Sequence, residues 1–311
     1  MGSISRRQFV ALSGAAAMAA ALPRRVKASP MGLPVGIQLY TVGKPMGEDP
    51  AGTLKQLYAI GYREVESAGM LKLTSQELRK MIDDAGLKCP SAHLQLGGED
   101  LSKAFDEAHA YGAQYAVSSV LRSFSPEFMK SARAAMEGGK GGPPPKLAPL
   151  GLDGFKKTAE KMNEVGKKAK AAGLQYTYHN HNFEFEKMPD GSPGYDILVK
   201  ETDPELVKFE IDCGWMKAAG YDPVAYMKTY PGRVRMLHIK DFQKAAPTTE
   251  LMGPGRPQGA DLGKGFVDYG PIFAEGKAAG IEHIFDEQET PFPVSQIESA
   301  KANFAYLEKF S

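Results

Sequence analysis

The sequence has few cysteines, almost no net charge and no long apolar run in its body, and each shortage excludes a class of protein. Cys89 and Cys213 are the two cysteines of the 311 residues. They are too few for a disulfide framework and do not form a Cys-x-x-Cys metal motif. We expect two free thiols, with a single bridge as the alternative in an oxidising compartment. The formal net charge of +1 provides no basic excess for a nucleic-acid partner.

The first 28 residues have the pattern of an export signal. Arg6 and Arg7 precede Phe9 and an alanine-rich run, in a pattern similar to a twin-arginine signal. The run is too short and too rich in alanine to span a membrane, and it ends at Ala28 like a signal-peptidase site. An amphipathic helix of the mature protein is the alternative. We therefore expect an exported, periplasmic protein whose fold covers residues 33–311, with no membrane partner.

Short apolar runs recur through the rest of the chain, and helix-like segments follow most of them. The first four runs begin near Val35, Tyr62, Lys88 and Ala113, about one βα unit apart. Four more follow, with the sequences LQYTYHNHNF, LVKFEIDC, VRMLHIKDF and IEHIFDEQ. Eight alternating units predict a single (β/α)8 TIM barrel, an α/β fold. A doubly wound open sheet is the alternative, although no nucleotide-binding glycine motif follows the first strand.

Two helices and one loop can be predicted in more detail. The stripe of Phe155, Ala159, Met162, Val165 and Ala169 predicts the buried face of a helix over residues 154–173. A second helix should be capped by Thr74 or Ser75 and should end at Gly86. The segment MEGGKGGPPPKLAPLG is rich in glycine and proline, which predicts a flexible loop.

Polar side chains, most of them able to bind a metal, lie late in the predicted strands, and a TIM barrel places its active site at those strand ends. From the second strand to the eighth, these residues are Glu66, His93, His179, His181, Asp212, His238, Lys240 and Glu287. His179 and His181 are two apart, so within one strand they would face the same side. Imidazoles and carboxylates together suit a borderline cation. The sequence therefore predicts one divalent metal ion, either Mn²⁺, Co²⁺, Zn²⁺ or Fe²⁺.

Five motifs, YHNHNFEF, FEIDCGW, LHIKDF, LGKGFVDYGPIF and FDEQE, together resemble the xylose isomerase-like TIM-barrel superfamily of sugar isomerases and epimerases. The resemblance implies one metal ion held by His179, Asp212, His238 and Glu287. The family usually has glutamate at the first of these positions. His179 is more similar to the pattern of inosose dehydratases than to that of ketose 3-epimerases, which use two metal-bound glutamates. The endonuclease IV pattern requires a histidine where this chain has Trp215.

The resemblance implies that the ion polarises a ketone while a base removes the neighbouring proton. The candidate catalytic residues are Glu287, His181, Lys240, Glu66 and His93. His181 could contact the substrate or orient another ligand. Lys240 could protonate a leaving oxygen or form a structural ion pair with Asp241 or Glu210.

The predicted export favours a free keto-sugar or glycoside as the substrate over a sugar phosphate. Relatives of this type imply a 3-keto-glycoside lyase or hydratase, or a dehydratase. An isomerase or epimerase of free sugars is the alternative, and a non-catalytic sugar-binding protein on the same barrel is a third possibility. The oligomeric state stays open. The loop from Gln243 to Lys264 could be a lid over the site or a passive insertion.

Overall fold

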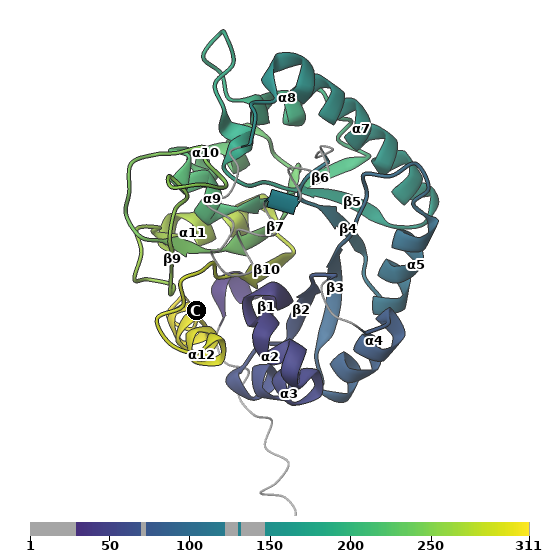
Figure 1. Ribbon diagram of the computed structural model, residues 1–311, viewed down its shortest axis with the longest axis vertical. Helices are drawn as coiled ribbons and strands as arrows, with labels where there is room; N and C mark the ends of the chain where they lie inside the picture. The colour runs from purple at the N-terminus through teal and green to yellow at the C-terminus, as the bar shows by residue number, and fades with distance from the viewer. Residues whose placement is uncertain (1–28, 70–72, 122–129, 132–146, 311) are drawn as a thin grey trace, which may run out of the picture.

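Eight parallel strands close into a barrel in the computed structural model, which describes residues 29–69, 73–121, 130–131 and 147–310 (Figure 1). The strands are β1 (Val35–Gln38), β2 (Glu64–Ser67), β3 (Lys88–His93), β4 (Tyr115–Ser118), β5 (Gln175–His179), β6 (Val207–Asp212), β7 (Val234–Ile239) and β10 (His283–Asp286). Strand β1 pairs with both β2 and β10, which closes the sheet. The predicted TIM barrel is therefore confirmed, and the open sheet is excluded.

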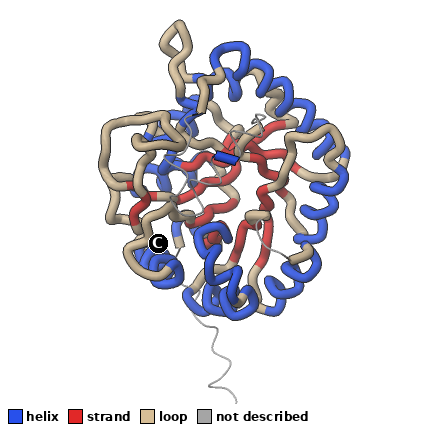
Figure 2. The backbone as a smooth tube through the Cα atoms, in the orientation of Figure 1, coloured by secondary structure: helices blue, strands red, loops and turns tan. Residues whose placement is uncertain are grey.

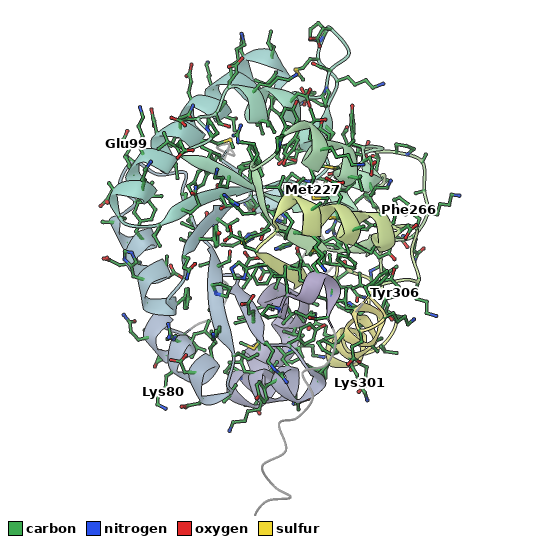
Figure 3. The ribbon with its side chains drawn as sticks, turned by 180° about the vertical axis from the view of Figure 1, so that it is seen from behind. Lys80, Glu99, Met227, Phe266, Lys301 and Tyr306 are labelled. Atoms are coloured by element: carbon green, nitrogen blue, oxygen red, sulfur yellow. The ribbon has the colours of Figure 1, made fainter. Side chains whose placement is uncertain are left out.

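Helices surround the strands on the outside of the barrel (Figure 2). They are α2 (Gly43–Glu48), α3 (Pro50–Ile60), α4 (Ser75–Asp84), α5 (Ser102–Tyr111), α7 (Gly151–Ala171), α8 (Gly194–Lys200), α9 (Cys213–Ala218), α10 (Pro223–Thr229), α11 (Tyr269–Ala279) and α12 (Gln296–Leu307), with the 3₁₀ turns η1 (Pro30–Gly32), η2 (Leu39–Val42) and η3 (Phe183–Phe185). Lys80 of α4 and Lys301 of α12 lie exposed on this outer layer (Figure 3). The part of the chain that the structure describes contains no helix long and apolar enough to cross a membrane.

Some predicted segments lie outside the described residues. These are the export signal at residues 1–28 and most of the loop rich in glycine and proline. The start of the predicted domain at residue 33 therefore stays a prediction, although the described fold begins close to it with η1.

Helix α7 buries the face that its sequence predicts. All five residues of the stripe are buried, with Phe155 fully inaccessible to solvent. Gly166 is buried on the same face, where a Cβ atom would lie only 2.7 Å from the backbone oxygen of Leu206. Helix α4 is capped by Thr74, which forms a capping box with Glu77. Both helices are thus fixed by local sequence signals that agree with their packing.

The two ends of the barrel carry different chemistry. At the amino end, His283 at the start of β10 bonds through Nδ1 to Glu64 at the start of β2, at 2.8 Å. Inward-facing apolar side chains of β4, β7 and β10 form a separate buried cluster, which consists of Tyr115, Val117, Met236 and Phe285. Cys89 and Cys213 are buried and free, as predicted.

The buried face of α7 gives a direct stability prediction. Replacing Phe155 with alanine should lower the free energy of unfolding by about 3–5 kcal/mol, because a large cavity would form in the core. The control is Lys157→Ala on the exposed face of the same helix, which should change stability by no more than about 0.5 kcal/mol. Urea unfolding of both variants measures the difference. Equal losses in the two variants would contradict the packing described for α7.

Candidate metal centre

Four buried donor groups meet at the carboxyl end of the barrel. His179 and Asp212 are the last residues of β5 and β6, His238 lies near the end of β7, and Glu287 directly follows β10. Strand register places Asp212 beside His238, and His238 beside Phe285 of β10. One ligand atom from each of the four residues lies within 4.8 Å of all the others. The structure thus brings together the four residues that the sequence predicts as ligands, and their role as ligands stays a prediction.

A direct hydrogen bond joins His238 Nδ1 and Glu287 Oε2 at 2.6 Å, but none joins His179 to Asp212. His179 Nε2 and Asp212 Oδ2 are 3.9 Å apart, too far for a hydrogen bond. The distance still allows both atoms to bind one ion, whose bonds to nitrogen and oxygen are about 2.1 Å. Asp212 Oδ1 accepts the Trp215 N–H at 2.8 Å, while Oδ2 lies 2.9 Å from the Lys240 ammonium. Two imidazoles and two carboxylates are the donor set of a borderline divalent cation.

Lys240 places a buried ammonium next to this group. Its Nζ lies 2.9 Å from Asp212 Oδ2, 3.2 Å from Glu287 Oε2 and 3.2 Å from Glu289 Oε1. Although burial disfavours the charged form, these carboxylates raise the pKa of Lys240 above its ordinary value. Lys240 therefore stays an ammonium across the physiological range.

The alternative partners predicted for Lys240 are wrong. Its ion pairs are with the three carboxylates of the site, and neither Asp241 nor Glu210 is among them. The Asp241 carboxylate turns away to accept backbone N–H groups of Phe242, Gly263, Gly265 and Val267. Asp241 thus fixes the loop that follows β7.

A second group of donors lies beside the first and shares two of its histidines. It consists of His93, His179, Glu210 and His238, again with ligand atoms within 4.8 Å of one another. Glu66 joins it, because its Oε2 lies 2.7 Å from His238 Nε2 and 3.1 Å from His93 Nε2. Despite burial, Glu66 and Glu210 raise the pKa of His93 to about 10. The predicted candidates Glu66 and His93 are therefore near the site and already paired.

Glu210 is the member of this second group that the sequence did not single out as a site residue. It lies two residues before Asp212 in β6 and is fully buried. Residues two apart in a strand share a face, so its spacing from Asp212 was the available signal. Glu210 lies deeper in the strand than the other candidates, which are all at or near the strand ends.

His181 lies near the site, but it is not part of strand β5 as predicted. Strand β5 ends at His179, so the expected alternation does not extend to His181. The chain leaves the strand because the Asn180 side chain bonds to the Asp212 N–H at 3.1 Å and the His181 N–H bonds to Glu184 at 2.9 Å. The two imidazole rings are still close, with centroids 5.2 Å apart.

The ring of His181 is buried at one edge. Its Nδ1 has no hydrogen-bond partner among the described residues, and Trp215 lies 5.8 Å away between ring centroids. Burial, together with the neighbouring His179 ring and the Lys240 ammonium, lowers the pKa of His181 well below its ordinary value. His181 therefore presents a free nitrogen near the candidate metal centre.

The loop from Gln243 to Lys264 is tied to the same end of the barrel. Asn182 donates to the backbone oxygens of Thr248 and Glu250 at 3.1 and 3.0 Å. Arg256 pairs with Glu289 at 2.5 Å, and the loop contributes β9 (Gly259–Ala260), which pairs with β8 (Asp241–Phe242). These contacts hold the loop against the site in this structure, and its role as a lid stays a prediction.

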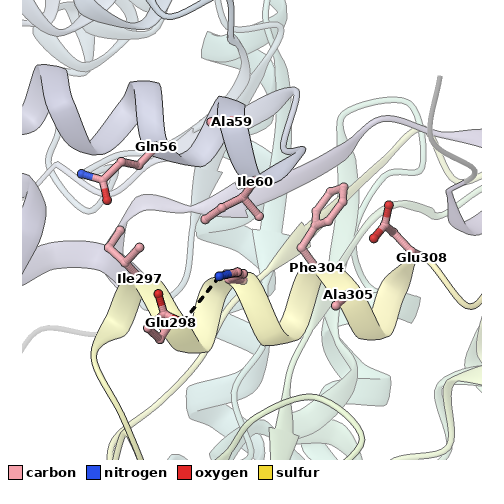
Figure 4. Close-up of a pocket in the computed structure, with 9 residues that line it drawn as sticks. Gln56, Ala59, Ile60, Ile297, Glu298, Phe304, Ala305 and Glu308 are labelled. Atoms are coloured by element: carbon pink, nitrogen blue, oxygen red, sulfur yellow. Dashed lines mark ion pairs between the residues drawn. The ribbon is translucent and has the colours of Figure 1, made fainter. Parts of the chain in front are cut away.

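A surface groove elsewhere on the protein carries no comparable chemistry. It lies between α3 and α12 and is lined by Gln56, Ala59, Ile60, Ile297, Glu298, Lys301, Phe304, Ala305 and Glu308 (Figure 4). Its lining includes an ion pair between Glu298 and Lys301 at 3.9 Å. Neither group of possible metal ligands in the described residues includes a residue of this groove, so we place the candidate site at the strand ends.

Comparison with known proteins agrees with this fold. Residues 54–309 match the family described as xylose isomerase-like TIM barrel. The chain belongs to this family. The predicted resemblance is therefore confirmed.

Individual relatives share about a quarter of their aligned residues with this chain. An inosose dehydratase from Lacticaseibacillus casei is 25% identical over 168 residues, which cover 50% of this chain and 54% of that protein. The chain thus matches about half the length of this curated relative. A sugar phosphate isomerase/epimerase structure from Parabacteroides distasonis is 26% identical, with a TM-score of 0.69 and coverage of 89% and 94% of the two chains.

A third member was solved in complex with magnesium. It is a xylose isomerase-like TIM barrel protein from Mycobacterium smegmatis, with 17% identity and a TM-score of 0.60. The alignment covers 91% of this chain and 97% of that protein. At this identity the likeness shows the fold alone.

Glu184 is a buried carboxyl group that supports the turn after β5. It accepts hydrogen bonds from the Tyr178 hydroxyl and from the His181 N–H, both at 2.9 Å. Burial raises the pKa of Glu184 to about 8, against an ordinary value of 4.5. Between these two values the folded protein holds a proton that the unfolded chain releases. Stability should therefore fall as the pH rises through this range.

We expect Glu184→Gln to weaken this pH dependence, because the neutral amide has no proton to lose. The variant should gain stability relative to the wild type as the pH is raised from 5 to 8.5. Urea unfolding midpoints at several pH values measure the effect. A stability difference that stays constant across the range would rule out Glu184 as the titrating group.

Proposed function

We propose that this chain is a divalent-metal-dependent enzyme of the sugar isomerase and epimerase type that removes a proton next to a ketone of a keto-sugar. We further propose that the reaction is an elimination, as in a 3-keto-glycoside lyase or hydratase, or a dehydratase. The observation that carries the proposal is the buried group of four donor atoms within 4.8 Å of one another, beside the Lys240 ammonium. The dehydratase name of the Lacticaseibacillus relative supports the same reaction class.

The proposed ligands are His179, Asp212, His238 and Glu287. A divalent cation bound there would act as a Lewis acid toward a substrate carbonyl and so make the neighbouring C–H more acidic. The identity of the ion stays open among the borderline divalent cations.

Lys240 is the proposed proton donor to the leaving oxygen. It is the buried ammonium within 3.2 Å of two of the proposed ligands, so it lies at the edge of the space that a substrate oxygen would enter. A positioned ammonium stabilises negative charge that develops on oxygen and can pass a proton to it. In an elimination, the C–H proton leaves to a base, the C–O bond breaks, and the departing oxygen takes its proton from Lys240.

His181 is the proposed base that removes the C–H proton. Its Nδ1 is buried without a hydrogen-bond partner. The other candidates are already engaged: Glu66 accepts from Gln38 and Ser91, and Glu287 contacts His238 at 2.6 Å. His93 is paired with Glu66 and Glu210. His181 is therefore the candidate that keeps a nitrogen without a partner among the described residues, in a ring 5.2 Å from that of His179.

A second function is favoured by one specific observation. The Parabacteroides distasonis structure, which aligns with 89% of this chain, is named a sugar phosphate isomerase/epimerase. In that reaction the same proton would be removed and then returned to carbon, with no loss of an oxygen substituent. Proton exchange without release of a leaving group would identify this alternative.

The predicted export signal narrows the proposed substrate class. An enzyme outside the cytoplasm would meet free sugars and glycosides more often than sugar phosphates. We therefore assign a keto-glycoside as the substrate class, with the aglycone as the leaving group when the ketone is at C3. The proton at C2 is then the acidic one, and C1 carries the bond that breaks.

Removing one proposed ligand should abolish tight metal binding. The wild type should retain about one equivalent of divalent ion after dialysis, and His238→Ala should retain much less than one. His283→Ala is the matched control, because this histidine is in the neighbouring strand at the opposite end of the barrel. Metal analysis of the dialysed proteins measures the difference. Equal metal content in His238→Ala and the wild type would contradict the proposed ligand set.

The proposed elimination can be tested with a chromogenic 3-keto-glucoside in D₂O. The metal-loaded wild type should release the aglycone faster than a blank without enzyme. Lys240→Met should slow release by about 100-fold or more, because proton donation to the leaving oxygen is lost. The control is Lys244→Met, at an exposed lysine of the loop that follows. Neither aglycone release nor deuterium incorporation at C2 by the wild type would refute the proposal.

A further inference from the structure

Two histidines at the proposed metal centre have carboxylates at both of their ring nitrogens. His179 faces Glu210 through Nδ1 at 3.0 Å and Asp212 through Nε2 at 3.9 Å. His238 faces Glu287 through Nδ1 at 2.6 Å and Glu66 through Nε2 at 2.7 Å. The two nitrogens of each ring thus belong to the two different donor groups. Which nitrogen binds an ion depends on which one carries the proton.

A neutral imidazole has one free lone pair and one N–H, so each ring can serve only one of the two groups as a ligand. The N–H on the other side then needs an acceptor within hydrogen-bond distance, because the site is buried. Two ions bound at once would require both rings to lose both protons. The shared rings therefore limit the centre to one ion that uses both histidines.

The distances at His179 decide which side the ion occupies. If the ion were beside Glu210, the His179 Nε2–H would have to donate to Asp212 across 3.9 Å, which is too long. If the ion is beside Asp212 and Glu287, the Nδ1–H donates to Glu210 at 3.0 Å, which is a normal hydrogen bond. At His238 the N–H has an acceptor within hydrogen-bond distance for both positions of the ion. The distances at His179 are therefore the ones that distinguish the two positions.

We propose that Glu210 is a positioning residue of the metal centre. Its Oε2 accepts the Nδ1–H of His179 and lies 3.2 Å from His238 Nε2, where Glu66 also accepts at 2.7 Å. These carboxylates fix the tautomers that leave His179 Nε2 and His238 Nδ1 free for the ion. The inference rests on the proposed function, because it assumes a cation held by the first donor group.

Replacing Glu210 with glutamine tests this inference through metal affinity. Both rings face the same oxygen, Glu210 Oε2. The amide oxygen of glutamine could take its place, but it is uncharged and therefore a weaker acceptor, so the two tautomers are held less strongly. Loss of an outer carboxylate of this kind weakens metal binding by about 10–100-fold. We expect that loss for Zn²⁺, measured by competition with a chromophoric chelator.

Glu64→Gln is the matched control for this substitution. Glu64 is also a buried strand glutamate bonded to a histidine nitrogen, His283 Nδ1, at 2.8 Å, but it lies at the amino end of the barrel. The control should bind Zn²⁺ as tightly as the wild type. Unchanged affinity in Glu210→Gln would overturn the proposal. So would a wild type that binds two ions and loses the second in Glu210→Gln, because Glu210 would then be a ligand.

A measurement without substitutions keeps the inference testable if Glu210→Gln fails to fold. In Zn²⁺-loaded wild type labelled with [¹⁵N]histidine, two-bond ¹⁵N–¹H spectra report which nitrogen of each ring carries the proton. We expect protonated Nδ1 at His179 and protonated Nε2 at His238. The reverse tautomer at His179 would overturn the role of Glu210 while leaving the metal centre intact. A wild type that binds no ion would overturn the metal centre and the inference together.

Discussion

Five of the buried carboxylates at the carboxyl end of the barrel lie in or next to the two donor groups, and a buried charge is tolerated only when it is paired. They are Glu66, Glu210, Asp212, Glu287 and Glu289. Lys240 and Arg256 supply two fixed positive charges at the same place, and three imidazoles lie among the carboxylates. A divalent cation would supply much of the missing positive charge. The need to balance this charge is the constraint that links the fold to the proposed chemistry.

The barrel topology brings these groups together. In a closed parallel sheet all strands end at the same rim, so residues far apart in the chain become neighbours. Strand register then places Asp212 beside His238, and the chain just after each strand contributes Lys240 and Glu287. The apolar layer below, which includes Phe285 beside His238, separates this polar rim from the unrelated pair of Glu64 and His283. The fold therefore confines the reactive groups to one end and leaves the other for stability.

The regular features of the chain could be predicted from sequence, because they depend on local patterns. The βα spacing predicted the barrel and the apolar stripe predicted α7. Residues late in the strands predicted where the site lies, and the family resemblance implied which four of them are ligands. The route of His181 could not be predicted, because Glu184 and Asn180 end β5 early through contacts made only in the folded protein. The partners of Lys240 were also missed, since they come from strands distant in sequence. The alternation of β6 places Glu210 on the same face as Asp212. Its role could be inferred only from its distances to the histidine rings, which the sequence does not give.

The central claim is that His179, Asp212, His238 and Glu287 share one cation. Crystals grown with Mn²⁺ and measured at the manganese absorption edge would test it most directly. The account predicts a single anomalous peak bounded by His179 Nε2, His238 Nδ1 and the carboxylates of Asp212 and Glu287. A peak between His93 and Glu210, or no peak at this end of the barrel, would contradict it.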